Sequence, residues 1–355
     1  NQNIWLDLIK IKRKDDGMNI KRIRIIVMAL ICGITLNMVA FGANNKPRPT
    51  PTKSPNTPEW IENLDKPKKT EPPKPSETSN PNATPDPNAT PTPTPTITPK
   101  PTPIVKKNIV VPILLYHHIT REKFDKTNSI SLISPEDFRK HMTAIKVHYT
   151  PISLRDYYEY VECKDGSKTI PENSIVVTFD DGYSSNYEIA YPILKELEIP
   201  ATIFVVTDTV GARAGEGKVN YSHFTWEEAK IMEDSGLIEI QSHTDNHVKL
   251  ATMNYNNLVL ELRRSKYLIE KNLNRACDMI AFPYGSYNDQ TLAAAQKAGY
   301  KVRLLVGDDT TDTDYEVNLT DDGVGAITRI TVSGSMGNVD VLDLIRKAIK
   351  QTKIN

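Results

Sequence analysis

The chain is poor in cysteine, and its charges balance, so two classes of protein can be set aside first. Only three cysteines occur in 355 residues, Cys32, Cys163 and Cys277, and their spacing fits neither a disulfide framework nor a cysteine-rich zinc site. A bridge between Cys163 and Cys277 is one alternative, and two buried free thiols are the other. Basic and acidic residues number 44 each, so the basic footprint typical of nucleic-acid binding is absent. A neutral sugar polymer stays compatible as a partner.

Residues 18–43 have the pattern of an export signal. Basic residues follow Met18, an apolar run covers residues 25–41, and small residues come next, as in secretory signal peptides. Cleavage before Ala43 is one interpretation. The run is also near the length of a short membrane span, so an uncleaved anchor is the alternative. Residues 1–17 precede this start and stay an unassigned extension.

A linker rich in proline and threonine is predicted over residues 44–107. The short repeat PNATP occurs twice in it, and a segment of this composition cannot bury apolar surface. We expect a disordered, extended chain, partly in polyproline II, that spans roughly 100 Å or more. Together with the export signal, the linker predicts an extracellular or cell-envelope protein whose N-terminus is associated with the membrane or the cell wall.

The remaining residues, 108–355, are enough for one sizeable domain. Ser134 is expected to cap the first helix, and Thr225 with Glu228 to form a capping box at a later one. Alternating strands and helices predict a parallel α/β sheet, either open or closed into a β/α barrel, with an active site at the carboxyl ends of the strands. The predicted strands cover residues 109–116, 174–180, 201–206, 237–242 and 278–284, and the predicted helices cover 134–148, 186–198, 225–236, 254–273, 288–300 and 338–351.

Polar residues that can bind a metal follow two of the predicted strands. The segment SHTDNH places His243 and His247 four residues apart, and this spacing puts two imidazoles on one face of a helical turn, where they can bind one ion. Two ordinary surface histidines are the alternative. A carboxylate from TFDDGY, at residues 178–183, completes a His-His-Asp set with open positions, which is typical of a catalytic zinc site.

The second carboxylate of TFDDGY and a third histidine suggest acid–base chemistry. Water activated by a metal needs a general base beside it, and neighbouring residues at a strand end point in different directions, so one aspartate can bind the ion while the other faces the water. His117, in YHHI at residues 116–119, can act as general acid for a leaving group. His118 is interpreted as a polar strand end, and Trp226 as packing at a helix start.

The motifs TFDDGY, SHTDNH and FPYG, in this order, resemble the polysaccharide deacetylases of the NodB-homology type, carbohydrate esterase family 4. The resemblance covers about residues 108–332 and implies a distorted (β/α) barrel that removes acetyl groups from N-acetylglucosamine polymers or from xylan. By position in the motifs, Asp180 resembles the catalytic base, and Asp181, His243 and His247 resemble the metal ligands. Tyr284 matches the residue whose backbone N–H helps to bind the oxyanion, with Pro283 beside it in the substrate site.

Two departures from the family pattern stand out. Many members carry an arginine three residues before that tyrosine, where this chain has Ala281, and a late histidine that acts as the acid, whereas no histidine follows His247 here. A subgroup resembling the poly-N-acetylglucosamine deacetylases carries its acid histidine on the first strand in a Tyr-His pair, and this match assigns the acid to His117. Arg329 is the candidate replacement for the missing arginine.

The resulting expectation is an exported, monomeric hydrolase that uses one divalent ion. Zinc is the first choice, with cobalt or nickel as alternatives. Its substrate would be an N-acetylated polysaccharide, either peptidoglycan or an exopolysaccharide. An esterase for O-acetyl groups is one alternative function. A catalytically silent carbohydrate-binding protein on the same fold is the other. The arginine missing at Ala281 gives it some weight, and the presence of both aspartates and both histidines argues against it.

Overall fold

The computed structural model describes residues 107–124, 131–216, 219–306, 318–319, 323–332, 334 and 341–352. The predicted signal or anchor at 18–43 and nearly all of the predicted linker lie outside the described residues. Within the described part of the chain, no helix combines the length and the hydropathy that a membrane crossing requires.

A parallel sheet forms the centre of the domain. Its strands run in the order β10-β9-β8-β7-β6-β2-β12, with β5 pairing β6 beside this path. Every pairing within the sheet is parallel, as the alternation of strands and helices predicted. The strands are β2 (Ile113–Tyr116), β5 (Thr150–Pro151), β6 (Ser174–Phe179), β7 (Ala201–Val205), β8 (Ile238–Ser242), β9 (Met279–Ala281), β10 (Val302–Leu304) and β12 (Ile330–Thr331).

The sheet curls until its two edge strands are linked. Leu304 of β10 forms a parallel bridge with Ile327, three residues before β12 begins. The Leu305 N–H donates to the Ile327 carbonyl at 2.7 Å, and the Ile327 N–H donates to the Arg303 carbonyl at 2.9 Å. The structure is therefore a distorted (β/α) barrel. The strand pattern in the sequence allowed an open sheet or a closed barrel, and the structure has the barrel.

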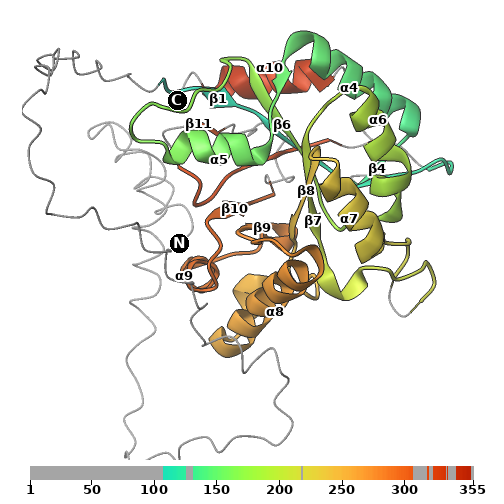
Figure 1. The fold of residues 1–355 in the computed structure, drawn as a ribbon, viewed down its shortest axis with the longest axis vertical. Coiled ribbons are helices and arrows are strands. Elements are labelled where there is room, and N and C mark those ends of the chain that lie inside the picture. The colour runs from blue at the N-terminus through green and yellow to red at the C-terminus, as the bar shows by residue number, and fades with distance from the viewer. Residues whose placement is uncertain are drawn as a thin grey trace, which may run out of the picture. The chain divides into compact units, whose positions relative to one another are not determined.

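Helices cover the outside of the barrel. Figure 1 shows β6 to β9 in the middle of the domain, with α4, α6 and α7 to the right and α8 and α9 below. Neighbouring helices touch in the succession α10, α4 and α6, and again in the succession α7, α8 and α9. Their bounds are α4 (Pro135–His148), α5 (Leu154–Glu162), α6 (Tyr191–Glu196), α7 (Trp226–Asp234), α8 (Tyr255–Leu273), α9 (Asp289–Lys297) and α10 (Val341–Thr352).

The predicted helix starts are confirmed in their atomic detail. The Ser134 hydroxyl accepts a hydrogen bond from the Asp137 N–H at the start of α4. Thr225 and Glu228 form a reciprocal capping box at α7, and Gly236, at φ +72°, follows its end. The predicted helix at 186–198 is less regular, because it begins with a π-helical turn, η1 (Asn186–Ala190), before α6.

Alternate residues of the strands face two different layers of the core. Leu114, Val177 and Ile203 pack toward the outer helices, whereas Ile113, Val176 and Phe204 pack inside the barrel. Leu154, Tyr157 and Tyr160 of α5 join this inner layer. The side chain of Arg155, also on α5, pairs with Glu239 and Asp278, which lie at the amino ends of β8 and β9. Helix α5 therefore fills the barrel from the amino ends of the strands and leaves the carboxyl ends open for a site.

Short elements complete the described chain. The strands are β1 (Val110–Val111), β3 (His118–Ile119), β4 (Leu132–Ile133) and β11 (Asn318–Leu319), and the 3-10 helices are η2 (Thr207–Thr209), η3 (Leu250–Thr252) and η4 (Pro283–Gly285). Cys163 and Cys277 are both free thiols; Cys277 is buried, but Cys163 is only half-buried because it follows the end of α5.

Candidate active site

The residues singled out in the sequence meet at the carboxyl ends of neighbouring strands. Asp180 and Asp181 directly follow β6, His243 follows β8, and His117 follows β2. Tyr284 comes three residues after β9, in η4. Since these strands are parallel neighbours in one barrel, all their carboxyl ends open on the same face.

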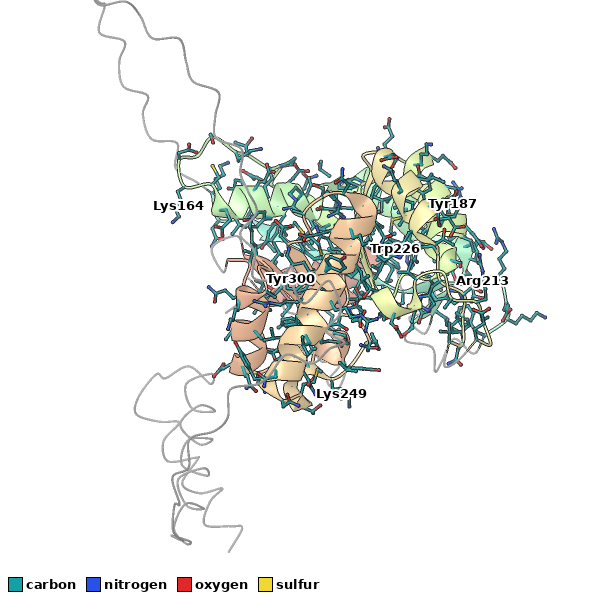
Figure 2. The ribbon with its side chains drawn as sticks, turned by 60° about the horizontal axis from the view of Figure 1, so that its bottom comes forward. Lys164, Tyr187, Arg213, Trp226, Lys249 and Tyr300 are labelled. Atoms are coloured by element: carbon teal, nitrogen blue, oxygen red, sulfur yellow. The ribbon has the colours of Figure 1, made fainter. Side chains whose placement is uncertain are left out.

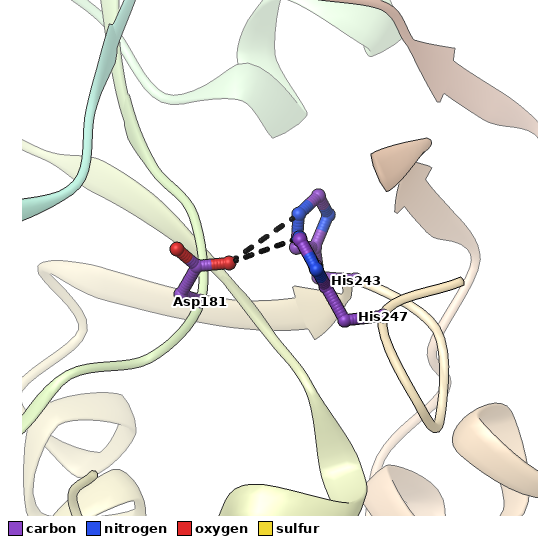
Figure 3. Close-up of side chains that lie close together, drawn as sticks. All are labelled: Asp181, His243 and His247. Atoms are coloured by element: carbon purple, nitrogen blue, oxygen red, sulfur yellow. Dashed lines mark ion pairs between the residues drawn. The ribbon is translucent and has the colours of Figure 1, made fainter. Parts of the chain in front are cut away.

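Asp181, His243 and His247 form a cluster with the ligand atoms of a metal site. One ligand atom from each lies within 4.8 Å of the others. The Asp181 Oδ1 atom is 3.6 Å from the His243 Nε2 atom and 3.3 Å from the His247 Nε2 atom (Figure 3). Two imidazole nitrogens and one carboxylate oxygen are a donor set that suits zinc and leaves positions for water and substrate.

Partners on the far side of each imidazole orient its Nε2 atom toward Asp181. The His243 Nδ1 atom lies 2.9 Å from the Ala281 carbonyl oxygen, which can only accept, so Nδ1 carries the proton and Nε2 is free to bind a cation. The His247 Nδ1 atom lies 3.1 Å from the Tyr284 hydroxyl. Burial, aided by the neighbouring His243, lowers the pKa of His247 to about 4, so this ring is neutral at pH 7, as a metal ligand must be.

The loop that carries both histidines is not the helical turn expected from their spacing. Residues 243–249 form no helix, and Thr244 and His247 have φ of +70° and +53°. The Glu261 carboxylate of α8 holds this loop by accepting hydrogen bonds from the N–H groups of Asp245 at 3.0 Å and Asn246 at 2.6 Å. The two imidazoles therefore converge through a buried side chain from another element rather than through helical geometry.

Asp180 is held by a buried arginine. The Arg329 guanidinium donates to both carboxylate oxygens of Asp180, at 2.7 and 2.6 Å, and donates further to the Leu305 carbonyl at 3.0 Å. Both side chains are almost fully buried, with exposed fractions of 0% and 1%. Burial alone would raise the pKa of Asp180, but the charge and hydrogen bonds of Arg329 outweigh it and hold this pKa far below its usual range. Asp180 is therefore a carboxylate at any pH near neutrality.

The arrangement of Arg329 bears on the arginine missing at position 281. Ala281 is buried in β9 and contributes its carbonyl to His243, so this position still serves the site. Arg329 lies just before β12, which is at the other end of the strand order from β9, and reaches Asp180 from there. The lack of an arginine at position 281 was the argument for a silent carbohydrate-binding protein. Arg329 offsets that lack, because it binds the Asp180 carboxylate instead.

His117 faces the same group of charges. Its Nδ1 atom is buried and has no hydrogen-bond partner among the described residues, and its carbonyl accepts from the Asn186 side chain at 2.9 Å. Burial lowers the pKa of His117, while the charges of Asp181 and Asp180 act in the opposite direction. His117 therefore has a buried ring nitrogen without a partner among the described residues and lies within electrostatic reach of both aspartates.

Tyr284 lies at the outer edge of the site. Its backbone has φ +58°, an unusual value for a residue other than glycine, and its side chain is 59% exposed. The ring packs edge-on against His247 with centroids 4.7 Å apart. Pro283 beside it is buried and fixes the start of η4. That the Tyr284 N–H binds an oxyanion stays a prediction, but its hydroxyl contact with His247 was not foreseen.

Two further residues that position Asp181 escaped the sequence analysis. The His223 Nδ1 atom lies 3.1 Å from the Asp181 carbonyl oxygen and 3.1 Å from the Thr209 hydroxyl. The Tyr183 ring packs on His223, with centroids 4.9 Å apart. In the sequence, His223 lies in a loop before a predicted helix and belongs to no motif. Its position beside Asp181 becomes visible only in the structure, where a β-bridge joins His223 to Tyr183 of TFDDGY.

Comparisons with known proteins agree with this geometry. The profile of the family described as polysaccharide deacetylase matches residues 167–303. YxkH of Bacillus subtilis, a protein provisionally named a polysaccharide deacetylase, is 30% identical over 237 residues, which cover 65% of this chain and 74% of that protein. A poly-beta-1,6-N-acetyl-D-glucosamine N-deacetylase of Staphylococcus aureus is 33% identical over 178 residues, which cover 48% of this chain and 59% of that enzyme.

A solved structure has the same fold. The deacetylase PplD of Streptococcus pyogenes, in complex with acetate, is 26% identical, with a TM-score of 0.56. The match covers 67% of this chain and 99% of that one. Nearly all of the streptococcal chain is thus accounted for by the curled parallel barrel described above.

Proposed function

Since the chain belongs to the polysaccharide deacetylase family, a family of hydrolases, we propose that it removes N-acetyl groups from a polymer containing N-acetylglucosamine. The products are acetate and a free amine on the sugar. The observation that carries this proposal is the Asp181–His243–His247 cluster beside an Asp180 carboxylate held by Arg329. The staphylococcal relative named for poly-beta-1,6-N-acetyl-D-glucosamine supports this polymer as the first substrate to test, with peptidoglycan as the second.

Asp181, His243 and His247 are proposed to hold one divalent ion, with zinc first and cobalt or nickel as alternatives. When bound, the ion supplies a Lewis acid that polarises the acetyl carbonyl and activates water. The Ala281 carbonyl fixes His243 in the tautomer that presents Nε2, and the Tyr284 hydroxyl holds the Nδ1 side of His247 so that its Nε2 atom faces Asp181. The ligand positions are therefore prepared before any ion arrives.

Asp180 is proposed to take the proton of the attacking water. Its low pKa keeps it ionised, so it is always available as an acceptor, although a weak one. Arg329 fixes the carboxylate plane with two parallel hydrogen bonds and so determines where the water can lie. The Tyr284 N–H is proposed to donate to the oxyanion that forms on the acetyl oxygen, and Pro283 to line the substrate site beside it.

His117 is proposed to protonate the departing amine. Burial lowers its pKa, so the protonated ring is a stronger acid than an ordinary imidazolium and gives up its proton readily. The cost is a smaller protonated fraction at neutral pH. An alcohol leaving group needs less help, so the O-acetyl esterase alternative predicts that His117 is dispensable.

The proposal is tested by acetate release from β-1,6-linked N-acetylglucosamine oligomers and from peptidoglycan fragments, with and without a chelator. We expect release that stops with the chelator and returns with added zinc. Asp180→Asn should keep the ion bound and lose activity; full activity in that variant would contradict the role of Asp180. If His117→Ala keeps wild-type turnover on the N-acetyl oligomer, another residue is the acid. If the chain instead cleaves an O-acetylated xylan and does so equally well without His117, the esterase becomes the better assignment.

We also propose that the protein acts outside the cytoplasm, held at the membrane or the cell wall. The proposal rests on the export pattern at residues 18–43 and on the proline- and threonine-rich linker at 44–107. Cell fractionation of the tagged full chain tests it. Recovery of the protein in the cytoplasmic fraction alone would overturn it. We propose a monomer, which sedimentation of the purified chain would check.

A further inference from the structure

Three aromatic rings form a cluster beside the candidate metal site. His118 comes from β3, Tyr183 follows TFDDG, and Tyr221 comes from the loop between η2 and α7. The ring centroids of His118 and Tyr221 are 4.4 Å apart and those of His118 and Tyr183 are 5.0 Å apart. Tyr221 and Tyr183 meet edge to face at 5.8 Å and 89°. Such tilted and edge-on contacts are the favourable arrangements of aromatic rings.

The cluster is fixed to the site by hydrogen bonds at its base. The Tyr183 ring packs on His223 with centroids 4.9 Å apart, and the His223 Nδ1 atom lies 3.1 Å from the Asp181 carbonyl oxygen. The His118 Nδ1 atom lies 2.9 Å from the Ser185 hydroxyl. The inner two rings are therefore anchored within a few residues of the catalytic doublet, and they support the outer ring from below.

Tyr221 is the part of the cluster that reaches solvent. It is 36% exposed and is one of few exposed large hydrophobic side chains in the described residues. Its ring rests on His118 and Tyr183 and keeps part of its surface open to a ligand. Trp226, nearby in sequence, differs in this respect because it packs against the core at the start of α7.

A second exposed aromatic residue lies beside another of the metal ligands. Tyr284, 59% exposed, contacts His247, whereas the cluster of Tyr221 is linked to Asp181 through His223, which packs on Tyr183 and lies 3.1 Å from the Asp181 carbonyl oxygen. The two loops lie apart in the domain: Figure 2 shows Arg213, from the loop of Tyr221, well apart from Lys249, which lies two residues after His247. One exposed aromatic ring is thus associated with His247 and the other with Asp181.

The chemistry of this surface suits a sugar ring. Burial, with a contribution from His223, lowers the pKa of His118 to about 4, so the ring beneath Tyr221 is uncharged at neutral pH. A hexopyranose in the chair form presents a face of C–H groups, and these pack on the electron-rich face of an aromatic ring. The hydroxyl of a tyrosine at the rim can meanwhile bond the polar edge of the sugar.

We propose that Tyr221, supported by His118 and Tyr183, binds a sugar unit adjacent to the one that loses its acetyl group. Tyr284 contacts the polymer beside His247. This inference rests on the proposed function and adds to it that the enzyme binds internal segments of a polysaccharide. Longer oligomers should therefore bind more tightly than a disaccharide, and Tyr221 should account for part of that difference.

Calorimetric titration with β-1,6-linked N-acetylglucosamine disaccharide and tetramer tests the inference. Asp180→Asn serves as the parent, so that no turnover occurs during the measurement. We expect Tyr221→Ala to weaken tetramer binding by about tenfold and to remove most of the advantage of the tetramer over the disaccharide. Tyr221→Phe, which keeps the ring, should stay within about twofold of the parent. In the active enzyme, Tyr221→Ala should raise KM for the tetramer more than it lowers kcat.

Tyr267→Ala is the matched control. Tyr267 lies half-buried on α8 beside Lys271, away from the strand ends, and its loss should leave tetramer binding unchanged. Equal affinity of the parent and Tyr221→Ala for the tetramer would overturn the inference even if the wild-type chain releases acetate. A wild-type chain that releases no acetate from any N-acetyl substrate would instead contradict the proposed function, and the titration would still show whether Tyr221 binds the sugar.

Discussion

At the scale of single residues, the ion pair of Asp180 and Arg329 limits which substitutions the site accepts. Two charges with exposed fractions of 1% and 0% depend on each other for compensation, because neither can be solvated by water. The pair need not add net stability over apolar residues of the same shape. Its evident use is to hold one carboxylate in one plane beside the metal ligands.

Arg329→Met should destabilise the protein by about 3–5 kcal/mol, because it leaves the Asp180 charge buried without a partner. Activity should fall further than stability predicts, since the carboxylate loses its fixed orientation. Urea unfolding and acetate release from the oligomer measure both. Arg346→Met is the control: Arg346 pairs with Asp343 at 2.7 Å on the exposed surface of α10, and its loss should change stability by less than about 1 kcal/mol. Equal effects of the two substitutions would refute the argument.

The same pair predicts how stability depends on pH. The folded-state pKa of Asp180 lies far below the value of about 3.9 expected in the unfolded chain. The stability that this lowered pKa contributes is therefore fully present above about pH 4 and is lost as the pH falls below it. The wild-type chain should accordingly lose stability between pH 4 and more acid pH faster than Asp180→Asn does. Thermal unfolding of both proteins across this range checks the slope; parallel curves would contradict it.

At the scale of elements, the loop from His243 to His247 depends on α8. Glu261 is buried, and besides the two backbone N–H groups it accepts from the Asn246 side chain at 2.8 Å. Asp245 is tied in a second direction by the Thr207 hydroxyl at 2.6 Å. The spacing of the histidines alone would leave the loop free to move, so its conformation is imposed by neighbours that are remote in sequence.

Glu261→Ala should leave the buried N–H of Asp245 and the partly buried N–H of Asn246 without an acceptor and loosen the loop. We expect zinc to bind about 10- to 100-fold more weakly, which is the usual effect of losing a group that orients metal ligands. Calorimetric zinc titration measures the affinity, and circular dichroism checks that the barrel remains. Asn256→Ala, on an exposed position of the same helix, should bind zinc as the wild type does. Unchanged zinc affinity in Glu261→Ala would show that the loop keeps its conformation without Glu261.

These elements also show what could be predicted from the sequence. Helix caps such as Ser134 and the Thr225–Glu228 box depend on residues three apart, so local chemistry is enough to place them. The strands ahead of Asp180 and His243 were equally clear, because each is a short apolar run. The helical turn expected for His243 and His247 was wrong, because the hydrogen bonds that the loop N–H groups donate to Glu261 override local spacing. His223 and Glu261 gave no local signal at all.

At the scale of the whole domain, closure of the barrel assembles the site. Arg329 stands just before β12, and β12 pairs with β2, which in turn pairs with β6. Residues 149 positions apart thereby form one ion pair, Arg329 with Asp180. The sequence could name Arg329 only as a candidate, because its distance from Asp180 depends on the order of the strands, which places β12 next to β2. The direct pairing of β2 with β6 sets Tyr116 opposite Phe179 and so brings His117 to the aspartates after β6.

An ion bound by ligands from β6 and β8 would connect two separate parts of this barrel. The unfolded chain lacks the cluster, so binding should stabilise the folded state by about 2.7 kcal/mol at a zinc concentration 100 times Kd. For a domain of this size we expect the melting temperature to rise by roughly 5–10 °C. Differential scanning calorimetry of the chelated and zinc-loaded full chain measures the shift. His243→Ala should show little or no rise because a ligand is missing, whereas Asp180→Asn should keep it; an equal rise in His243→Ala would place the zinc elsewhere.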